Sequence, residues 1–423
     1  MTIRLLTLFI LLGLLIPFFS TFNNHTSAVE PEKTVPDQKN STKLFDIPGV
    51  AHWVERQEKG IVSLNIKMTS DHVLKAVGEQ TELYSLSFNG TSLKDEGMKY
   101  LVTLKNLHEI NIEDTMINGT GLKYLAQLKN LERISLKNSK TEDKGLVHLA
   151  MLDNLAALDL SETLINGEGL KHLVGCKNLV QLDLNNLKLS DQGVSSLGNL
   201  ESLQIVSLSE SQIDDNDLAS LSRLTALTHL IMRGNQIKGS GLKNLSSLSN
   251  LKFLDLAGNP LEDSDLDSLA KLSNSIIILN LSSTGIKGSC LKQLAGKKEL
   301  RELLLVETSI DDEGLKQIGK ITSLTRLDLK SASFTDEGLK ALAPLTRLTE
   351  LSLAGSKVSD LEAVSELMQL NSLDLTQTQI TDSSLQALSK IKNLKFIKLF
   401  ETKVSESGIK AIQEKLPNAE FFK

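Results

Sequence analysis

The stretch that decides the fold reads LHEINIEDTMINGTGLKYLAQLKN at residues 107–130 and LERISLKNSKTEDKGLVHLAMLDN at residues 131–154. Both segments place apolar residues at the same offsets, and both return to Leu after 24 residues. Self-similarity at a fixed period of this size is the sequence signature of a solenoid, in which each repeat is one supersecondary unit. The chain is therefore expected to stack similar units side by side rather than to fold around one central core.

The same frame extends in both directions from this stretch. Units start at Leu83, Leu107, Leu131, Leu155, Leu179, Leu203, Leu227, Leu251, Ile276, Leu300, Leu324, Leu348, Leu370 and Leu394. A shorter, degenerate unit starts at Ile61, which gives about 15 units. The unit at Leu251 is one residue longer than its neighbours and the unit at Leu348 is two residues shorter. We place both length changes outside the strands, because stacking requires a fixed strand register.

Each unit has two halves with different periods. Leu158-Asp159-Leu160 alternates like a strand with one buried face, whereas Leu170 and Leu173 are spaced like residues on one face of a helix. Neither half can bury its apolar face alone, so stacking should give a continuous core between an inner parallel sheet and outer helices. The sequence therefore predicts an α/β fold class, a horseshoe with the sheet on its concave face and helices on its convex face.

Two residue types recur where the helical half begins. Asp precedes it in several units, in position to cap the helix N-terminus, namely Asp95, Asp191, Asp312, Asp336 and Asp382. Gly sits just before the first helical Leu and is expected to relax the turn, for example Gly97, Gly193, Gly314 and Gly338. Further glycines, Gly119, Gly167 and Gly239, are assigned to turns, because no phosphate-binding residues follow them.

The pattern L-x-x-L-x-L-x-x-T-x-I-x-D-x-G-L-x-x-L-x-x-L-x-N resembles leucine-rich repeats, specifically the exported bacterial kind with 24-residue repeats. The resemblance covers residues 61–416 and is specific for fold but not for function. One position departs from it, because Thr or Ser mostly replaces the usual Asn or Cys, and only Asn235 and Asn259 keep Asn. We expect the hydroxyls, such as those of Thr115 and Thr163, to form a ladder that bonds neighbouring units.

The ends of the chain differ from the repeats. Residues 1–28 carry one positive charge and a short apolar run, which predicts a signal peptide or, if uncleaved, an N-terminal membrane anchor. Residues 29–46 are polar and contain prolines, as in a flexible linker. Residues 47–60 are interpreted as an N-terminal capping helix, and residues 417–423 as a C-terminal cap. An extracytoplasmic location follows from the export signal: secreted, periplasmic or on the cell surface.

Composition and motifs argue against several functions. The net charge of −6 provides no basic field for nucleic acid. The two cysteines, Cys176 and Cys290, lie in units too far apart for a disulfide, and we predict two free thiols. No nucleophile motif and no metal-ligand spacing occurs, and His148 and His172 are read as a partly exposed stripe. We therefore predict no enzyme activity, no cofactor and no metal.

The concave face offers the best candidate site. Most side chains that point from the strands into this face are small or polar, but one group is not: His229, Ile231, Arg233, Phe253, Ile278, Leu304 and Val306. A contiguous exposed apolar patch of this kind usually marks a binding surface, although scattered apolar residues on a long surface have little cost. A second group, Phe396, Lys398 and Phe400, is expected to be covered by the tail residues Phe421 and Phe422.

Three non-catalytic functions are compatible with these residues. The favoured one is a non-catalytic extracytoplasmic module that binds a protein partner on its concave face. The alternative is a carbohydrate or cell-wall binder that would use a polar ladder, Asp159, Asp183, Asn185, Asp255 and Asp328. It ranks second because this face has few aromatic side chains on which a sugar could stack. A structural surface spacer is the third, and the sequence names no partner for any of them.

Overall fold

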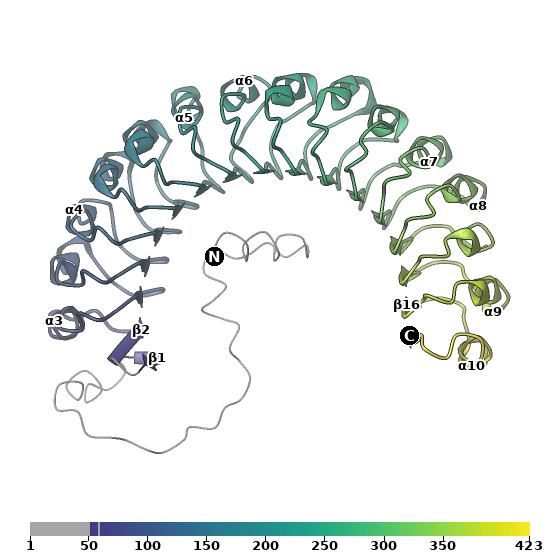
Figure 1. Cartoon of the computed structure of the whole chain (residues 1–423), viewed down its shortest axis with the longest axis horizontal. Helices are drawn as coiled ribbons and strands as arrows, with labels where there is room; N and C mark the ends of the chain where they lie inside the picture. Colours follow the sequence, from purple (N-terminus) through teal and green to yellow (C-terminus); the bar gives the residue numbers. More distant parts are fainter. Residues whose placement is uncertain (1–50, 58–59) are drawn as a thin grey trace, which may run out of the picture.

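A computed structural model describes residues 51–57 and 60–423 and shows an arc of stacked units, with strands along its inner side and helical elements along its outer side (Figure 1). The first strand, β1, spans Ala51–Gln57 and pairs antiparallel with β2. From β2 onward every consecutive pair of strands is parallel and in register. The predicted fold class is therefore confirmed.

The inner sheet is built from very short strands, most of them three residues long. They are β2 (Gly60–Ile66), β3 (Ser85–Ser87), β4 (Glu109–Asn111), β5 (Arg133–Ser135), β6 (Ala157–Asp159), β7 (Gln181–Asp183), β8 (Ile205–Ser207), β9 (His229–Ile231), β10 (Phe253–Asp255), β11 (Ile278–Asn280), β12 (Glu302–Leu304), β13 (Arg326–Asp328), β14 (Glu350–Ser352), β15 (Ser372–Asp374), β16 (Phe396–Lys398) and β17 (Glu420–Phe422).

The outer layer mixes short α-helices with 3₁₀ helices, where the sequence predicted helices without distinguishing them. The α-helices are α3 (Asp71–Gly78), α4 (Leu122–Leu125), α5 (Asp191–Leu197), α6 (Leu218–Leu221), α7 (Asp312–Ile318), α8 (Asp336–Leu339), α9 (Asp382–Leu385) and α10 (Glu406–Gln413). The 3₁₀ helices are η2 (Asp95–Leu101), η3 (Asp143–Met151), η4 (Glu168–Gly175), η5 (Ser240–Ser247), η6 (Asp263–Asp265), η7 (Asp267–Lys271), η8 (Ser289–Leu294), η9 (Lys340–Leu342), η10 (Val364–Glu366) and η11 (Gln386–Lys390). A 3₁₀ helix is wound more tightly than an α-helix, which suits units whose strands are only about 4.8 Å apart.

One apolar core runs the length of the arc between these two layers. The central strand residues, such as Leu158, Leu182 and Leu254, are fully buried, and so are the outer-layer residues Leu170 and Leu291. The alternation predicted for the strands is thus confirmed, since each strand turns its central residue to the core and its flanking residues to the concave side. Folding removes nearly all of the apolar surface of these Leu side chains from water, which is the main favourable contribution to folding.

The predicted capping helix at residues 47–60 is wrong where the structure describes it. Residues 51–57 form β1 instead, which pairs with β2 from Ala51 opposite Ile66 to Gln57 opposite Gly60. A helix at this end would leave the outer backbone N–H and C=O groups of β2 without partners, whereas an antiparallel strand satisfies them. Residues 47–50 lie outside the described residues, as do the predicted signal peptide and linker. No helix in the described part of the chain is long and apolar enough to cross a membrane.

The Asp residues predicted to cap the outer helices do not cap their own helices. The side-chain oxygens of Asp95 instead accept hydrogen bonds from the next unit, from the backbone N–H of Asn118 at 2.9 Å and of Gly121 at 2.6 Å. Asp382 bonds the N–H of Ser405 in the same way. Where a side-chain cap is present it lies one residue earlier, for example the hydroxyl of Ser190, which accepts from the N–H of Gly193. The Asp carboxylates therefore link successive units.

The helix-start glycines have a different cause from the one predicted. Gly193 and Gly314 have negative φ, so they relax no turn; rather, a Cβ on Gly193 would lie 2.3 Å from the carbonyl oxygen of Asn166 in the preceding unit. These glycines permit close stacking of units. The turn glycines behave as predicted: Gly119, Gly167 and Gly239 all have positive φ, which side chains rarely adopt.

The expected hydroxyl ladder between units is present at Ser211, whose hydroxyl donates to the carbonyl of Leu184 in the preceding unit at 2.7 Å, but it is absent at Thr115 and Thr163. Thr115 and Thr163 donate to carbonyls three residues earlier in their own unit, Ile112 and Leu160, at 2.8 and 2.6 Å. A Thr hydroxyl has one donor hydrogen on a short side chain, and here that hydrogen is donated to a carbonyl of the same turn. The residue Ser356, at the same position, has a buried hydroxyl with no partner among the described residues.

Asn at this position does reach the neighbouring unit. The amide nitrogen of Asn235 donates to the carbonyl of Leu208 at 2.8 Å, and its oxygen accepts from the N–H groups of Ser211 and Ile213 at 3.0 Å. Asn259 repeats the arrangement one unit later, with a 2.8 Å bond to the carbonyl of Met232. The two units with Asn are thus joined by more hydrogen bonds than those with Thr.

A second Asn ladder runs along the side of the arc, at the residue before the first Leu of a unit. Each side-chain amide donates to a backbone carbonyl of the preceding unit, for example Asn130 to Lys105 at 2.9 Å and Asn154 to Lys129 at 2.9 Å. The other members are Asn106, Asn178, Asn250 and Asn393. The unit at Leu348 has Arg347 at this position instead.

One charged residue occupies a core position. Lys297 stands where most other units have Leu and a few have Ile or Cys, and it is 4% exposed. Its ammonium group donates to the carbonyl of Ala270 at 3.0 Å and to the carbonyl of Leu272, both in the unit that carries the extra residue. The insertion therefore leaves carbonyls that Lys297 satisfies, and burial lowers the pKa of this lysine.

A candidate protein-binding face

The concave face is organised as parallel rows of side chains, because every strand pairs in register with the next. We call the first and last residues of the three-residue strands row one and row two, and the residues two positions after each strand row three. On β9 these are His229, Ile231 and, beyond the strand, Arg233. Each row runs from strand to strand along the arc. A residue's neighbours in its row therefore lie about 4.8 Å away on the adjoining strands.

The structure brings three of the predicted site residues together in row one. His229 on β9 pairs with Phe253 on β10, which pairs with Ile278 on β11. The rings of His229 and Phe253 are stacked, with centroids 5.7 Å apart. Ile205 on β8 continues the row on the other side of His229, and sequence reasoning missed it. Its position in the repeat frame could have identified it, because it is the same position as that of His229.

The remaining predicted residues surround this row but do not all touch. Ile231 in row two pairs with Asp255, so it is separated from Leu304 by Asp255 and Asn280. Val306 lies two residues beyond Leu304 on the same side of β12, in row three. The predicted patch is therefore an apolar row with a second apolar pair beside one end, not a single continuous surface.

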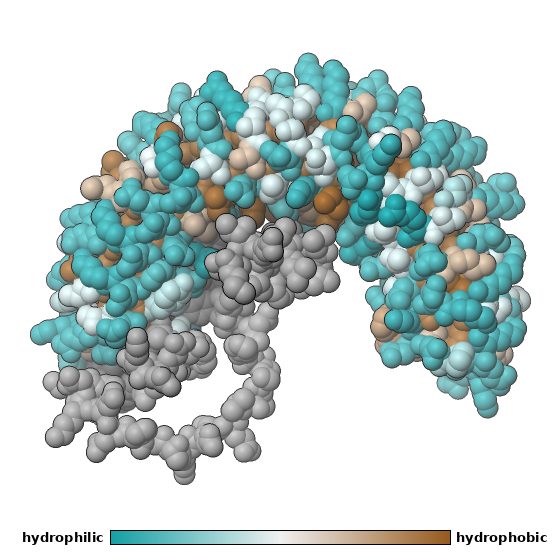
Figure 2. Space-filling view, viewed as in Figure 1, coloured by the Kyte–Doolittle hydropathy of each residue, from teal (hydrophilic) through white to brown (hydrophobic). Residues whose placement is uncertain are grey.

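Burial differs among these residues. Ile278 is nearly buried at 6% exposed, whereas His229, Ile231, Phe253, Leu304 and Val306 are half-buried and Arg233 is exposed. Burial lowers the pKa of His229 to about 4, so this imidazole is neutral at physiological pH. Row one is hence uncharged from β8 to β11. In Figure 2 hydrophobic residues appear along the inner edge at the crown of the arch, against a mostly hydrophilic outer rim.

Beside the apolar row, towards the N-terminal end, row two carries two carboxylates on adjacent strands. Asp159 on β6 pairs with Asp183 on β7, and both are flanked in the row by small hydroxyls, Ser135 and Ser207. Burial raises the pKa of Asp159, and burial together with the negative charge of Asp159 raises that of Asp183 to about 7. We call Asp159 and Asp183 the acidic pair.

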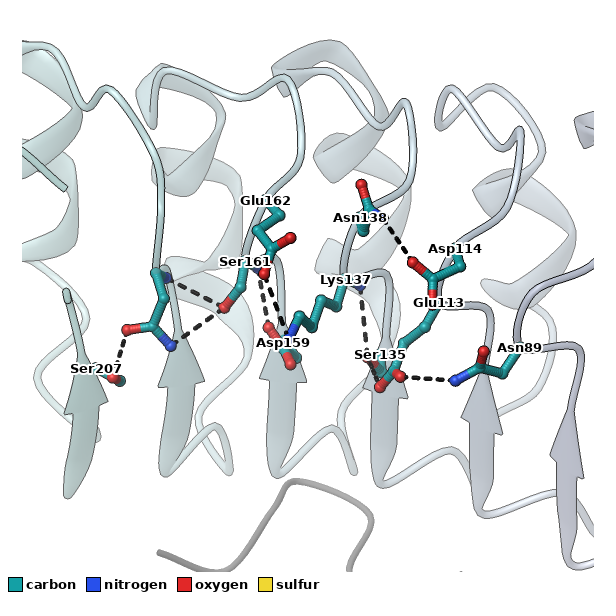
Figure 3. Close-up of polar contacts among 11 residues, drawn as sticks. Asn89, Glu113, Asp114, Ser135, Lys137, Asn138, Asp159, Ser161, Glu162 and Ser207 are labelled. Atoms are coloured by element: carbon teal, nitrogen blue, oxygen red, sulfur yellow. Dashed lines mark hydrogen bonds and ion pairs between the residues drawn. The ribbon is translucent and has the colours of Figure 1, made fainter. Parts of the chain in front are cut away.

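The polar side chains around the acidic pair bond mainly to one another (Figure 3). Glu113 accepts from the amide of Asn89 at 3.0 Å and from the hydroxyl of Ser135 at 2.7 Å. The Lys137 ammonium lies 3.3 Å from the carboxylate of Glu162. Such a network spans successive units and fixes the side chains of this half of the face.

The ladder that would serve a carbohydrate is partly used by the backbone. Asp159, Asp255 and Asp328 each accept from the N–H two residues along the chain, at 2.9, 2.9 and 3.1 Å. The amide of Asn185 is taken by Ser161 and Ser207. These groups have fewer free donors and acceptors to offer a sugar than their number in the sequence suggests.

The aromatic group near the C-terminal end is not covered as predicted. β17 continues the sheet, and its Phe421 pairs with Ile397 and packs on the core. Phe396 and Phe400 nevertheless remain 43% exposed, and Phe422 remains 40% exposed. Period-two alternation explains this outcome, because a strand added in register places only every second residue over the core.

Features that would support catalysis are weak in the described residues. No group of three or more His, Cys, Asp or Glu could hold a metal ion there. Cys176 and Cys290 are free and buried, and burial raises the thiol pKa of both, that of Cys176 to about 11. An open cleft of about 550 Å³ lies towards the C-terminal end, beside Glu350, Asn371 and Lys395, and contains none of the predicted site residues.

Comparisons with known proteins match these repeats. The family model described as Leucine Rich repeat matches residues 224–246, 320–343 and 367–389, and the model described as Leucine Rich Repeat matches residues 250–272. No curated protein sequence matches the chain. The repeats of this chain, with their parallel strands and outer helices, are leucine-rich repeats.

Solved structures of the same fold come from bacteria and from animals. An internalin (inlF) from Listeria monocytogenes has a TM-score of 0.57 at 21% identity, with 84% of this chain and 94% of that chain covered. The LRR protein LIC12759 from Leptospira interrogans has a TM-score of 0.60 at 21% identity, with 85% and 93% covered. A chain of the mouse RP105/MD-1 complex has a TM-score of 0.58 at 21% identity, with 79% and 66% covered. The fold commonly mediates protein–protein interaction, and its members are typically non-catalytic scaffolds.

Proposed function

We propose that this protein is a non-catalytic, extracytoplasmic module that binds a protein partner on its concave face. The observation that carries the proposal is the apolar row from Ile205 through His229 and Phe253 to Ile278, on a face whose other side chains are mostly small or polar. Aromatic side chains are enriched in the buried cores of protein interfaces, and contiguous apolar side chains on a surface mark a binding site. Export rests on the sequence of residues 1–28.

The rigidity of the face supports a protein partner over a glycan. The strands that carry the row are fixed by in-register backbone bonds and by the amide of Asn235, so little conformational entropy would be lost on binding. Carbohydrate sites need free hydrogen-bonding groups, whereas those of Asp159, Asn185 and Asp255 are partly engaged within the protein.

The test is photo-crosslinking from the concave face in an envelope extract of the producing cell. A photoreactive phenylalanine analogue replaces Phe253 in one variant and Met151 in the other, since Met151 is 63% exposed at the end of the outer helix η3. We expect a discrete protein adduct from position 253 and none from position 151. The same adduct from both positions, or from neither, would contradict the proposal.

A matched pair of triple variants identifies which residues bind. Ile231→Ser, Phe253→Ser and Leu304→Ser together should abolish capture of the crosslinked protein. The control removes more exposed apolar surface elsewhere, at Met116, Met151 and Leu164, each replaced by Ser. Equal capture by both triple variants would place the binding surface away from rows one to three. Capture of a glycan in place of a protein would favour the carbohydrate alternative.

A further inference from the structure

The charges beside the apolar row restrict the chemistry of its partner. Towards the N-terminal end the row meets the acidic pair on β6 and β7, and Glu162 and Glu210 lie just beyond the ends of β6 and β8. Lys137 is the cation paired with Glu162. Among the described residues no salt bridge neutralises Asp159, Asp183 or Glu210.

At the opposite end of the apolar row the carboxylates share a cation. Glu302 on β12 lies 3.5 Å from Arg326 on β13, and Arg326 also lies 3.5 Å from Glu350 on β14. Two carboxylates that pair on adjacent strands with no salt bridge among the described residues therefore occur on the N-terminal side of the row. Charged residues at an interface are usually matched by opposite charges on the partner. A partner would therefore need positive charge at the N-terminal end of the apolar row.

The shape of the negative region favours a long side chain. Asp159 is only 6% exposed, and its neighbours along the sheet are the small residues Ser135, Ala157 and Ser161. A carboxylate recessed among small side chains is reached by Lys or Arg, whose charge sits on a flexible stem of three or four carbons. The free oxygen of Asp159 and the adjoining carboxylate of Asp183 would then pair with such a cation.

We propose that the partner presents an extended protein segment in which apolar residues lie over Ile205, His229, Phe253 and Ile278, and Lys or Arg residues follow over the acidic pair. This inference rests on the proposed function, since it names the partner class of the same face. The six strands β6–β11 span roughly 24 Å, which is the extended length of about seven residues. The segment thus combines two chemistries within a short stretch.

The probes are two fluorescent peptides of about ten residues. Both carry Leu and Phe in one half, and the other half carries Lys in the first peptide and Glu in the second. We expect the Lys peptide to bind the full chain at least about tenfold more tightly than the Glu peptide at low salt, with the difference shrinking as salt is raised. Equal affinities, tighter binding of the Glu peptide, or no binding of either would overturn the proposal.

Isosteric variants locate the charge effect. Asp159→Asn with Asp183→Asn removes the negative charge of the acidic pair, which at pH 8 includes most of that of Asp183, and keeps an oxygen for the N–H of Ser161; at that pH it should weaken the Lys peptide about tenfold or more. The control is Asp374→Asn on β15, which has the same turn bond to Thr376 and should change little. Equal weakening by both changes would mean that general charge attraction, not the acidic pair, binds the peptide.

A third comparison separates this inference from the proposed function. Phe253→Ser should also weaken the Lys peptide, because its apolar half would lose its main contact. If Phe253→Ser has no effect on the peptide, the combined site does not exist. If the crosslinking experiment succeeds while the Glu peptide binds better, the concave-face function stands and the basic partner is wrong. Failure of crosslinking from position 253 would remove the function itself.

Discussion

At the scale of single residues, the chain shows how one position in a repeat can be filled by side chains that are similar in polarity but unequal in reach. Thr163 closes its own turn, whereas Asn235 also bonds two N–H groups and a carbonyl of the preceding unit. The difference follows from the amide, which has two donors and an acceptor further from the backbone than a hydroxyl.

Replacing Asn235 by Thr tests this difference. The variant would leave the buried N–H groups of Ser211 and Ile213 and the carbonyl of Leu208 without partners, and we expect a loss of about 2–4 kcal/mol in unfolding free energy. Urea unfolding followed by circular dichroism measures it. The exposed neighbour Gln236→Thr serves as control and should lose less than about 0.5 kcal/mol. Equal losses in the two variants would contradict the ladder.

The acidic pair gives a pH-dependent prediction. The pKa of Asp183 is raised to about 7, so the folded protein holds a proton that the unfolded chain releases near pH 4. Its contribution to stability is present below that pH and is lost as the pH rises through 7. Asp183→Asn, which is neutral throughout, should melt like the wild type near pH 4 and be more stable by about 1–2 kcal/mol at pH 8, a value reduced for partial solvent screening.

The measurement is the difference in melting temperature between variant and wild type across that pH range. Asp374→Asn, in the same row on β15, serves as the control. A constant difference for Asp183→Asn from pH 4 to 8 would show that no raised pKa is involved.

At the scale of elements, the joints between units depend on carboxylates that cap the turn of the following unit. Asp215 is a clear case, because its oxygens accept from the N–H groups of Lys238 at 2.8 Å, Gly239 at 3.0 Å and Gly241 at 2.5 Å. Asp215→Ala should cost about 2–3 kcal/mol, because three donors lose a charged acceptor.

Thermal unfolding of Asp215→Ala beside Lys238→Ala checks this assignment. Lys238 is exposed and contributes only its backbone to the joint, so its truncation should be close to neutral. If the Asp215 variant melts with the Lys238 variant, the carboxylate does not hold the joint.

How much of the fold could be predicted from sequence is clearest at this scale. The strands and the inner sheet followed from the alternation at residues such as Leu158 and Leu160, because burial imposes that pattern directly. The contacts of Asp95 and Gly193 could not be predicted in this way. Asp95 bonds the following unit and Gly193 packs on the preceding one, and the sequence of a single repeat does not show contacts between units. β1 was not predicted, because it forms to pair with the backbone N–H and C=O groups at the open edge of β2. The amino-acid sequence does not show which backbone groups need a partner.

The candidate site was predictable to a similar degree. The repeat frame placed His229, Phe253 and Ile278 on neighbouring strands, but row membership depends on counting from each strand start. For that reason Ile231 and Leu304 were grouped although Asp255 and Asn280 separate them, and Ile205 was omitted.

At the scale of the whole molecule, each unit touches only its neighbours, so damage should remain local before it becomes global. Leu160 is fully buried in the core below β6. Leu160→Asp would place an unpaired charge there and should destabilise the adjoining units by several kcal/mol. Hydrogen exchange is expected to lose protection around residues 131–184 and to keep it beyond residue 300. An unchanged melting temperature and unchanged exchange would contradict the inside-outside assignment.

Successive units are joined by unequal numbers of side-chain hydrogen bonds, which has a mechanical consequence. The unit at Leu348 has Arg347 in place of the lateral Asn, and the hydroxyl of Ser356 has no partner in the part of the chain that the structure describes. Exposed side-chain bonds, such as those of Asp336 to Ser359 and Asp360, join this unit to the preceding one. If the two ends of the arc were pulled apart, fewer buried side-chain hydrogen bonds would resist the force at this joint than at the joints made by Asn235 and Asn259. We therefore expect this joint to open under a lower force than the joints at Asn235 and Asn259, so that the strands bearing the apolar row keep their shape under load.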